Sequence, residues 1–235
     1  MEILYEDNHI IIVNKRPGEI VQGDKTGDTP MVDELKQLVK ERDAKPGNVF
    51  MGVVHRLDRP VGGVVIFAKT SKALTRLNEM LRRGEIHKTY WALTRSLPAE
   101  PQATLTHYLR SIEKSNKTLV YNAPRDDAKE ARLRYTLLAR GERFNLLEVE
   151  LLTGRKHQIR AQLSAIGCPI RGDLKYGDKR SNPDGSISLL ARRIEFEHPV
   201  SHRPICVTAP VPDERLWLEL EALAAGTKSS NIPTE

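Results

Sequence analysis

The sequence predicts an α+β protein with a mixed, largely antiparallel central sheet flanked by helices. Strand-like segments arrive in runs instead of alternating one by one with helices, which favours this class over a parallel α/β fold. Between Thr104 and Leu152 the segments mostly alternate apolar and polar residues and are joined by polar turns, as in a β-meander. The chain has 235 residues, 39% of them hydrophobic, so it is long enough to bury a sizeable core.

The first part of the chain reads as short strands and two helices. The clearest helix is Ser71–Arg83, because its leucines share one face, Thr70 or Ser71 can cap it, and Gly84 ends it. The expected elements are, in order, strands Ile3–Tyr5 and His9–Asn14, helix Pro30–Arg42, strands Gly52–Val54 and Val64–Ala68, helix Ser71–Arg83 and strand Glu85–Arg95.

The second part reads as a meander followed by helices and strands. Arg132 and Arg134 alternate with Leu133 and Tyr135, which predicts a strand with one polar face that we take to be solvated. The expected elements are strands Thr104–Arg110, Thr118–Tyr121, Ala131–Arg140 and Phe144–Leu152, helix Lys156–Ile166, an extended piece Cys168–Gly172, strands Ile187–Phe196 and Ile205–Ala209, and helix Leu216–Leu223. We expect one domain over residues 1–225 and a disordered tail over residues 226–235, which is rich in Ser, Pro and Thr.

Composition excludes several classes of protein. The sequence has no run of about 18 apolar residues that could span a membrane, and its first residues do not resemble a signal peptide. Cys168 and Cys206 are far apart and have no metal-binding spacing, so we expect no disulfide framework, no metal and a cytoplasmic protein. The formal net charge of +6 is compatible with a polyanionic partner, and without a long Lys/Arg tail such a site would be folded.

The stretch Val53–Thr70 carries the strongest chemical signal. Two apolar, β-rich runs flank a polar loop that contains Asp58 and ends in Pro60 and a Gly–Gly pair. Arg56 and Arg59 bracket Asp58, and neighbouring cations favour an ionised carboxylate. Such a carboxylate could serve as a nucleophile or a base. On composition alone, a structural role remains the more frequent alternative, in which Asp58 caps the turn and pairs with Arg56.

Four segments together resemble the RluA-type pseudouridine synthases. The sequence His55-Arg56-Leu57-Asp58-Arg59-Pro60-Val61-Gly62-Gly63 is similar to the family's catalytic motif, with Gly62 where a Ser is usual. The other matching segments are Leu4–Gly18, Lys88–Ala92 and Leu152–Arg160, the last running on into Gly167–Gly177. A later segment departs from the family's usual L-H-A, because Leu190 stands in place of His.

The resemblance implies a pseudouridine synthase fold, with an active-site cleft between two sub-lobes, and an enzyme that isomerises uridine to pseudouridine in RNA. Asp58 would be the catalytic carboxylate, Arg160 the cation that pairs with it, and Tyr90 the residue that stacks on the target base. Whether Asp58 adds to the sugar or ring, or removes a proton, stays open. The residues expected to bind substrate are His55, Arg56, Arg59, Arg155 and His157, the last two alternatively orienting their loop.

The resemblance also implies the partners. We expect the substrate to be tRNA or large-subunit rRNA, with a slight preference for a TruC-like role on tRNA, and we expect a monomer without cofactor. The pattern begins at Leu4, so we expect no separate N-terminal RNA-binding domain. Two alternatives remain. One is an inactive RNA-binding protein of the same fold. The other is a hydrolase, which would need a second carboxylate; Asp173 is a candidate, although the resemblance assigns it to a structural turn.

Overall fold

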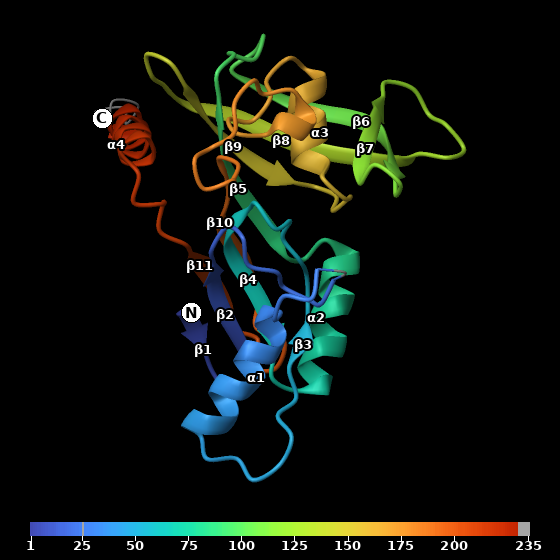
Figure 1. Cartoon of the computed structure of the whole chain (residues 1–235), viewed down its shortest axis with the longest axis vertical. Helices are drawn as coiled ribbons and strands as arrows, with labels where there is room; N and C mark the ends of the chain where they lie inside the picture. The colour runs from blue at the N-terminus through green and yellow to red at the C-terminus, as the bar shows by residue number, and fades with distance from the viewer. Residues whose placement is uncertain (25, 230–235) are drawn as a thin grey trace. The chain divides into compact units, whose positions relative to one another are not determined.

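The computed structural model describes residues 1–24 and 26–229, and its chain forms two compact units (Figure 1). The first unit comprises Met1–Lys88 and Ala191–Ala209, and the second comprises Thr89–Leu190 and the chain from Pro210 onward. Strands and helices follow one another in runs, and the predicted α+β class is confirmed. None of the described helices is long and apolar enough to cross a membrane.

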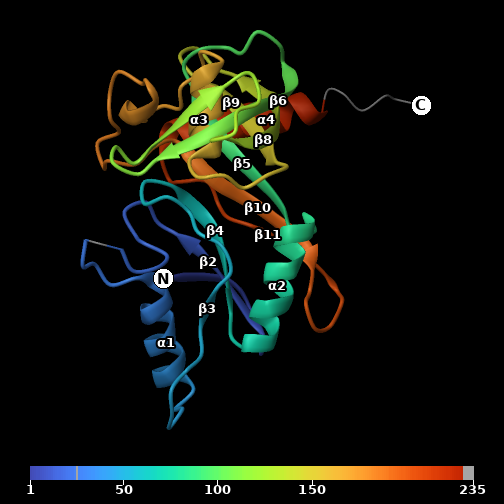
Figure 2. The same cartoon turned by 90° about the vertical axis from the view of Figure 1, so that its right-hand side faces the viewer.

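The first unit is a sheet with a helix on each face. Ile11 and Val13 of β2 pack against α1, whereas Ile10 and Ile12 pack against α2, because neighbouring residues of a strand point to opposite faces. Figure 2 shows α1 and α2 on opposite sides of these strands. The elements of the first unit are β1 (Glu2–Glu6), β2 (Ile10–Lys15), α1 (Met31–Arg42), β3 (Gly52–Val53), β4 (Gly62–Ala68), α2 (Ser71–Arg83), β11 (Pro204–Thr208), the first two residues of β5 (His87–Thr94) and most of β10 (Leu189–Glu197).

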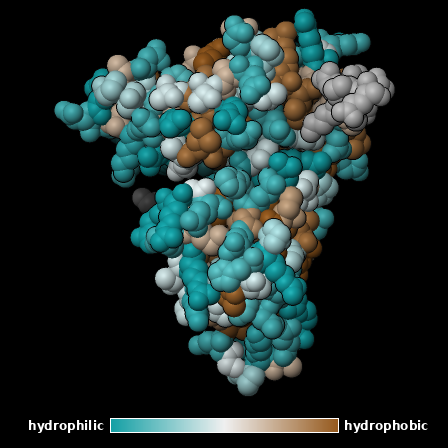
Figure 3. Space-filling model, turned by 180° about the vertical axis from the view of Figure 1, so that it is seen from behind, coloured by the Kyte–Doolittle hydropathy of each residue, from teal (hydrophilic) through white to brown (hydrophobic). Residues whose placement is uncertain are grey.

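The second unit is an antiparallel sheet in the order β5-β9-β8-β6-β7. On β8, Arg132 and Arg134 are exposed and Leu133 and Tyr135 are buried, so the predicted alternation is confirmed. Hydrophilic residues cover much of the face seen in Figure 3. Besides the rest of β5, the elements of the second unit are β6 (Gln102–Ile112), β7 (Lys117–Tyr121), β8 (Lys129–Arg140), β9 (Asn145–Leu151), α3 (Gln158–Ala165), a 3₁₀ turn η1 (Leu174–Tyr176) and α4 (Arg215–Ser229).

Two helix boundaries differ from the prediction by more than one residue. The helix expected over Lys156–Ile166 begins only at Gln158, because the preceding residue, His157, has φ of 53° and cannot continue a right-handed helix. The last helix was expected to end at Leu223, but α4 extends to Ser229. This helix therefore overlaps residues 226–229 of the tail expected over residues 226–235, and residues 230–235 lie outside the described part.

Candidate functional site

Asp58 opens a tight turn in the first unit, as the sequence predicted. The Val61 backbone N–H donates a hydrogen bond to the Asp58 carbonyl oxygen at 3.0 Å, and the chain then enters β4. The Asp58 residue is half-buried. A carboxylate on a closed turn at the start of a buried strand has little freedom to move, which suits a reacting group.

The turn is held in place by a buried lysine from another strand. Lys15, at the end of β2, is 1% exposed. Its Nζ donates to the carbonyl oxygens of Val61 at 2.7 Å, Arg59 at 3.0 Å and Asp58 at 3.4 Å, and to that of Arg16 at 3.1 Å. Burial lowers the pKa of Lys15 to about 8, although the negative charges of Glu19 and Asp58 oppose this shift. Lys15 is therefore both a clamp on the turn and a cation beside Asp58.

Neither of the two arginines beside Asp58 is seen to pair with it among the described contacts. The Arg59 guanidinium binds Asp28 at 2.6 Å, Asp24 at 3.4 Å and the Thr26 hydroxyl at 2.7 Å. Arg56 is exposed and forms no ion pair within the part of the chain that the structure describes, which argues against the structural alternative in which it pairs with Asp58. The substrate contacts predicted for both arginines stay predictions.

The departure at Gly62 is explained by packing. A Cβ built on Gly62 would lie 3.2 Å from the Lys15 carbonyl oxygen and 3.3 Å from Pro17 Cδ, so this position favours a residue without a side chain. The neighbouring Gly63 has φ of 112°, and a Cβ there would lie 2.3 Å from the Ala191 carbonyl oxygen. Gly62 thus leaves the turn of Asp58 intact.

The departure at Leu190 also has a packing reason. Leu190 is 4% exposed and lies in the apolar cluster that Trp217 of α4 forms with Trp91 and Leu146. A histidine in this cluster would bury a polar ring among apolar side chains, at a cost in free energy.

Arg160 of α3 is fixed by two buried neighbours in the second unit. Its Nε donates to Asp173 Oδ2 at 2.7 Å and its Nη2 donates to Asp173 Oδ1 at 2.9 Å. The Arg160 and Asp173 side chains are 6% and 1% exposed. The guanidinium also lies over the Tyr176 ring, 5.0 Å from its centroid. A bidentate pair with a ring beneath it leaves the planar guanidinium one orientation.

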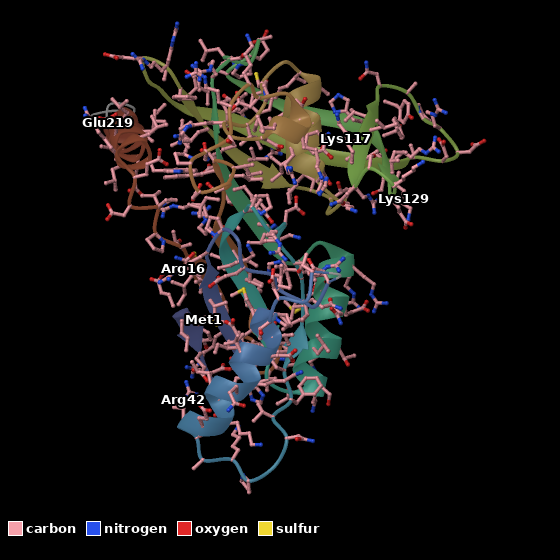
Figure 4. The ribbon with its side chains drawn as sticks, in the orientation of Figure 1. Met1, Arg16, Arg42, Lys117, Lys129 and Glu219 are labelled. Atoms are coloured by element: carbon pink, nitrogen blue, oxygen red, sulfur yellow. The ribbon has the colours of Figure 1, made fainter. Side chains whose placement is uncertain are left out.

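Tyr176 connects this arginine to a neighbouring strand. Burial raises the pKa of Tyr176, so its hydroxyl keeps the proton that it shares with His157 Nδ1 at 2.8 Å. The same oxygen accepts the Thr118 backbone N–H of β7 at 2.8 Å. The Lys117 ammonium, labelled on β7 in Figure 4, lies 5.6 Å from the ring centroid. The ring under Arg160 is thus held from several sides.

The loop before α3 is ordered by a glutamine. Gln158 Oε1 accepts hydrogen bonds from the Thr153 hydroxyl at 2.8 Å and the Arg155 N–H at 2.9 Å. Arg155 Nε donates to the Glu130 carbonyl oxygen at 2.9 Å, and His157 is 8% exposed. Of the two roles considered for Arg155 and His157, these contacts favour orienting the loop, and a phosphate contact stays a prediction.

The three predicted catalytic residues come from both units. Asp58 lies in the first unit, and Tyr90 and Arg160 lie in the second. Tyr90 is 7% exposed on β5 and pairs in register with Val149 of β9. The pairing of Arg160 with Asp58 stays a prediction, whereas the pair with Asp173 is observed.

Sequence reasoning missed the roles of Lys15, Asp173 and Tyr176. All three lie in segments that resemble the family, but nothing in a single sequence says which distant group each contacts. The buried pair with Arg160 also weakens the hydrolase alternative, because a carboxylate that binds a guanidinium with both oxygens is poorly suited to act as the second catalytic carboxylate. Among the described residues, no group of three or more His, Cys, Asp or Glu could hold a metal ion.

Comparison with known proteins identifies the family. The RNA pseudouridylate synthase family matches residues 9–165. A ribosomal large subunit pseudouridine synthase D of Xanthomonas campestris is 33% identical over 91% of this chain and 67% of its own length. The chain belongs to this family. A ribosomal large subunit pseudouridine synthase C of Buchnera aphidicola is also 33% identical, over 89% of this chain and 66% of its own length.

Two solved structures share the fold of this pseudouridine synthase. The human RNA pseudouridylate synthase domain containing 4 superposes with a TM-score of 0.76 at 23% identity, over 95% of this chain and 93% of that chain. The human domain containing 1 gives 0.71 at 21% identity, over 100% and 96%. The predicted family and fold are therefore confirmed, and the chain is an isomerase that converts uridine to pseudouridine in RNA.

Proposed function

We propose that this synthase isomerises a defined uridine of large-subunit ribosomal RNA, with Asp58 as the catalytic carboxylate. In this reaction the bond between N1 and C1′ breaks, the base turns, and a bond between C5 and C1′ forms. The proton on C5 leaves and N1 gains one, so the change is redox-neutral. Asp58 supplies the carboxylate that starts the cleavage, Arg160 the cation that keeps it ionised, and Tyr90 the ring that stacks on the base.

The clamp of Lys15 on the Asp58 turn is the observation that carries this proposal. A buried ammonium bound to the carbonyls of one turn is an expensive arrangement, and it is retained where a turn must stay in one conformation. The fixed orientation of Arg160, between Asp173 and the Tyr176 ring, supports a preorganised second group.

The choice of RNA rests on the relatives. Those with 33% identity carry the name ribosomal large subunit pseudouridine synthase, which favours rRNA over the tRNA that the HRLDRPV motif suggested. The enzyme would act in the cytoplasm as a monomer. Its target uridine must leave the base stack, which costs least in a loop or at a helix end.

A pseudouridine map tests the proposal. RNA from cells with and without the gene is treated with carbodiimide and read by reverse-transcription stops. The expected result is the loss of one or more sites in large-subunit rRNA, restored by the wild-type gene and by Asp33→Asn, an exposed control on α1, but not by Asp58→Asn.

Other outcomes are equally informative. Loss of a tRNA site would overturn the rRNA substrate and keep the activity. If Asp58→Asn restored the site, the role of Asp58 would be wrong. If no site were lost and the purified protein bound transcribed rRNA without modifying it, the inactive RNA-binding alternative would replace the proposal.

A further inference from the structure

Lys88 is a partly buried cation for which the described part of the chain provides no counter-ion. It is the second residue of β5 and is half-buried, and its burial lowers the pKa of its ammonium group. Across residues 1–24 and 26–229, no carboxylate pairs with its Nζ and its side chain forms no hydrogen bond. Removing a charge from water costs free energy unless a partner compensates for it, so an unpaired Lys88 is unfavourable in the protein alone.

The neighbouring His55 supplies no negative charge to compensate for Lys88. His55 Nε2 accepts the Ile66 backbone N–H at 3.2 Å, so in the neutral ring the proton lies on Nδ1. Burial, and then the positive charge of Lys88, lower the pKa of His55 to about 3. His55 is therefore neutral near pH 7. The Lys88 ammonium and the His55 Nδ1–H are both groups that can donate hydrogen bonds, and two such donors suit an anion.

Lys88 lies two residues before Tyr90 on one strand. Side chains two apart on a strand leave the same face, about 6.5 Å apart along it. If Tyr90 stacks on the target base, Lys88 is within one nucleotide's reach of that base. An ammonium with three donors on a flexible stem suits a single phosphate oxygen, which does not need the planar fork of an arginine.

We propose that Lys88 binds the phosphodiester of the target nucleotide or of its immediate neighbour, and that the RNA supplies the missing counter-ion. The inference rests on the proposed function, because it places the target base at Tyr90. It assigns Lys88 a role in substrate binding that is separate from the chemistry at Asp58.

Binding at several salt concentrations tests the site. In the Asp58→Asn background, which binds without turnover, Lys88→Met is expected to weaken RNA binding about tenfold and to reduce the slope of log K against log salt by about one. Lys40→Met, which removes the same charge from an exposed position on α1, is expected to change neither. Lys88→Met should retain the wild-type melting temperature or exceed it, since it removes an unpaired charge, whereas a merely structural lysine would lower it.

A neutral methylphosphonate replaces the phosphates around the target one at a time to locate the contact. With Lys88 present, one linkage should lose about tenfold in affinity, and with Lys88→Met that same linkage should lose nothing. If the two losses instead add at every linkage, or if Lys88→Met leaves affinity and salt slope unchanged, the Lys88 site is refuted. In an enzyme that still isomerises its RNA, that result leaves the proposed function standing; an enzyme that modifies no RNA would refute the function itself.

Discussion

The buried pair of Arg160 and Asp173 makes a quantitative prediction for Asp173→Asn. The two side chains are 6% and 1% exposed and share two hydrogen bonds of 2.7 and 2.9 Å. Removing one partner of a buried ion pair costs about 3–5 kcal/mol, because the remaining charge loses the carboxylate that offset its desolvation. Asparagine keeps one acceptor oxygen, so we expect the lower end of this range. For a chain of this size that corresponds to a melting temperature lower by about 6–12 °C.

Thermal unfolding followed by circular dichroism measures this loss. The matched control is Glu219→Gln, which breaks the exposed pair of Glu219 and Arg215, whose side chains are 52% and 91% exposed. An exposed pair of this spacing contributes about 0.3–0.5 kcal/mol, so the control should melt within about 2 °C of the wild type. If Asp173→Asn melted as close to the wild type as the control does, the argument from burial would be wrong.

Activity separates the structural role of Asp173 from the catalytic role of Arg160. At a temperature where both proteins are folded, Asp173→Asn should lower kcat more than it changes KM, because the guanidinium loses its fixed orientation. The double variant Arg160→Met with Asp173→Leu replaces the ion pair by apolar side chains, which is often neutral or stabilising. It should recover the melting temperature and remain inactive. An active double variant would exclude Arg160 from catalysis.

Three further predictions concern the first unit. Lys15→Met removes the ammonium that donates to the carbonyl oxygens of Asp58, Arg59 and Val61, so urea unfolding should show a loss of at least about 2 kcal/mol and kcat should fall with the far-ultraviolet spectrum retained; an unchanged kcat would exclude the clamp. The pKa of His55, about 3, lies below its unfolded value, so the unfolded state binds more protons. Acidification from pH 6.5 towards 3 should therefore lower the free energy of unfolding by up to about 1.4 kcal/mol per pH unit more in the wild type than in His55→Gln, and parallel pH curves for the two proteins would contradict this. Gly63→Ala should melt far below Gly62→Ala, because its Cβ would overlap backbone at 2.3 Å whereas that of Gly62 has 3.2 Å; equal melting temperatures would contradict the φ argument.

The helix α2 could be predicted from sequence because all its signals are local. It spans Ser71–Arg83 as expected, the Thr70 Oγ1 accepts the Ala73 N–H at 3.2 Å, and Gly84 closes it with φ of 74°. Periodicity, an N-terminal cap and a C-terminal glycine lie within fifteen residues of each other, so no distant contact was needed.

The start of α3 could not be predicted in this way. Lys156 and His157 suit a helix by propensity, but Gln158 binds the turn before it, and His157 takes a left-handed conformation while its ring binds Tyr176. Tertiary hydrogen bonds overrode the local preference.

The candidate site likewise has a part that local sequence predicts and a part that depends on distant contacts. The turn of Asp58 could be predicted, since Pro60 and the glycines lie beside it in the sequence. Asp173, the partner of Arg160, lies 13 residues further along the sequence in a loop. The carbonyls of the Asp58 turn that Lys15 binds lie 43 to 46 residues from it in the sequence. Periodicity carries no information about contacts of this range, and the motif placed these residues without giving their roles.

Three cations have limited access to water, and the described chain compensates two of them. Lys15 is compensated by backbone carbonyls, and its contribution is to hold a turn. Arg160 is compensated by the carboxylate of Asp173, and its contribution is a fixed direction for charge. Lys88 has no such partner in the described chain, although the same desolvation acts on it. Because an uncompensated charge costs stability, and the other two show that this chain can supply partners, the missing counter-ion of Lys88 is most simply the anionic substrate.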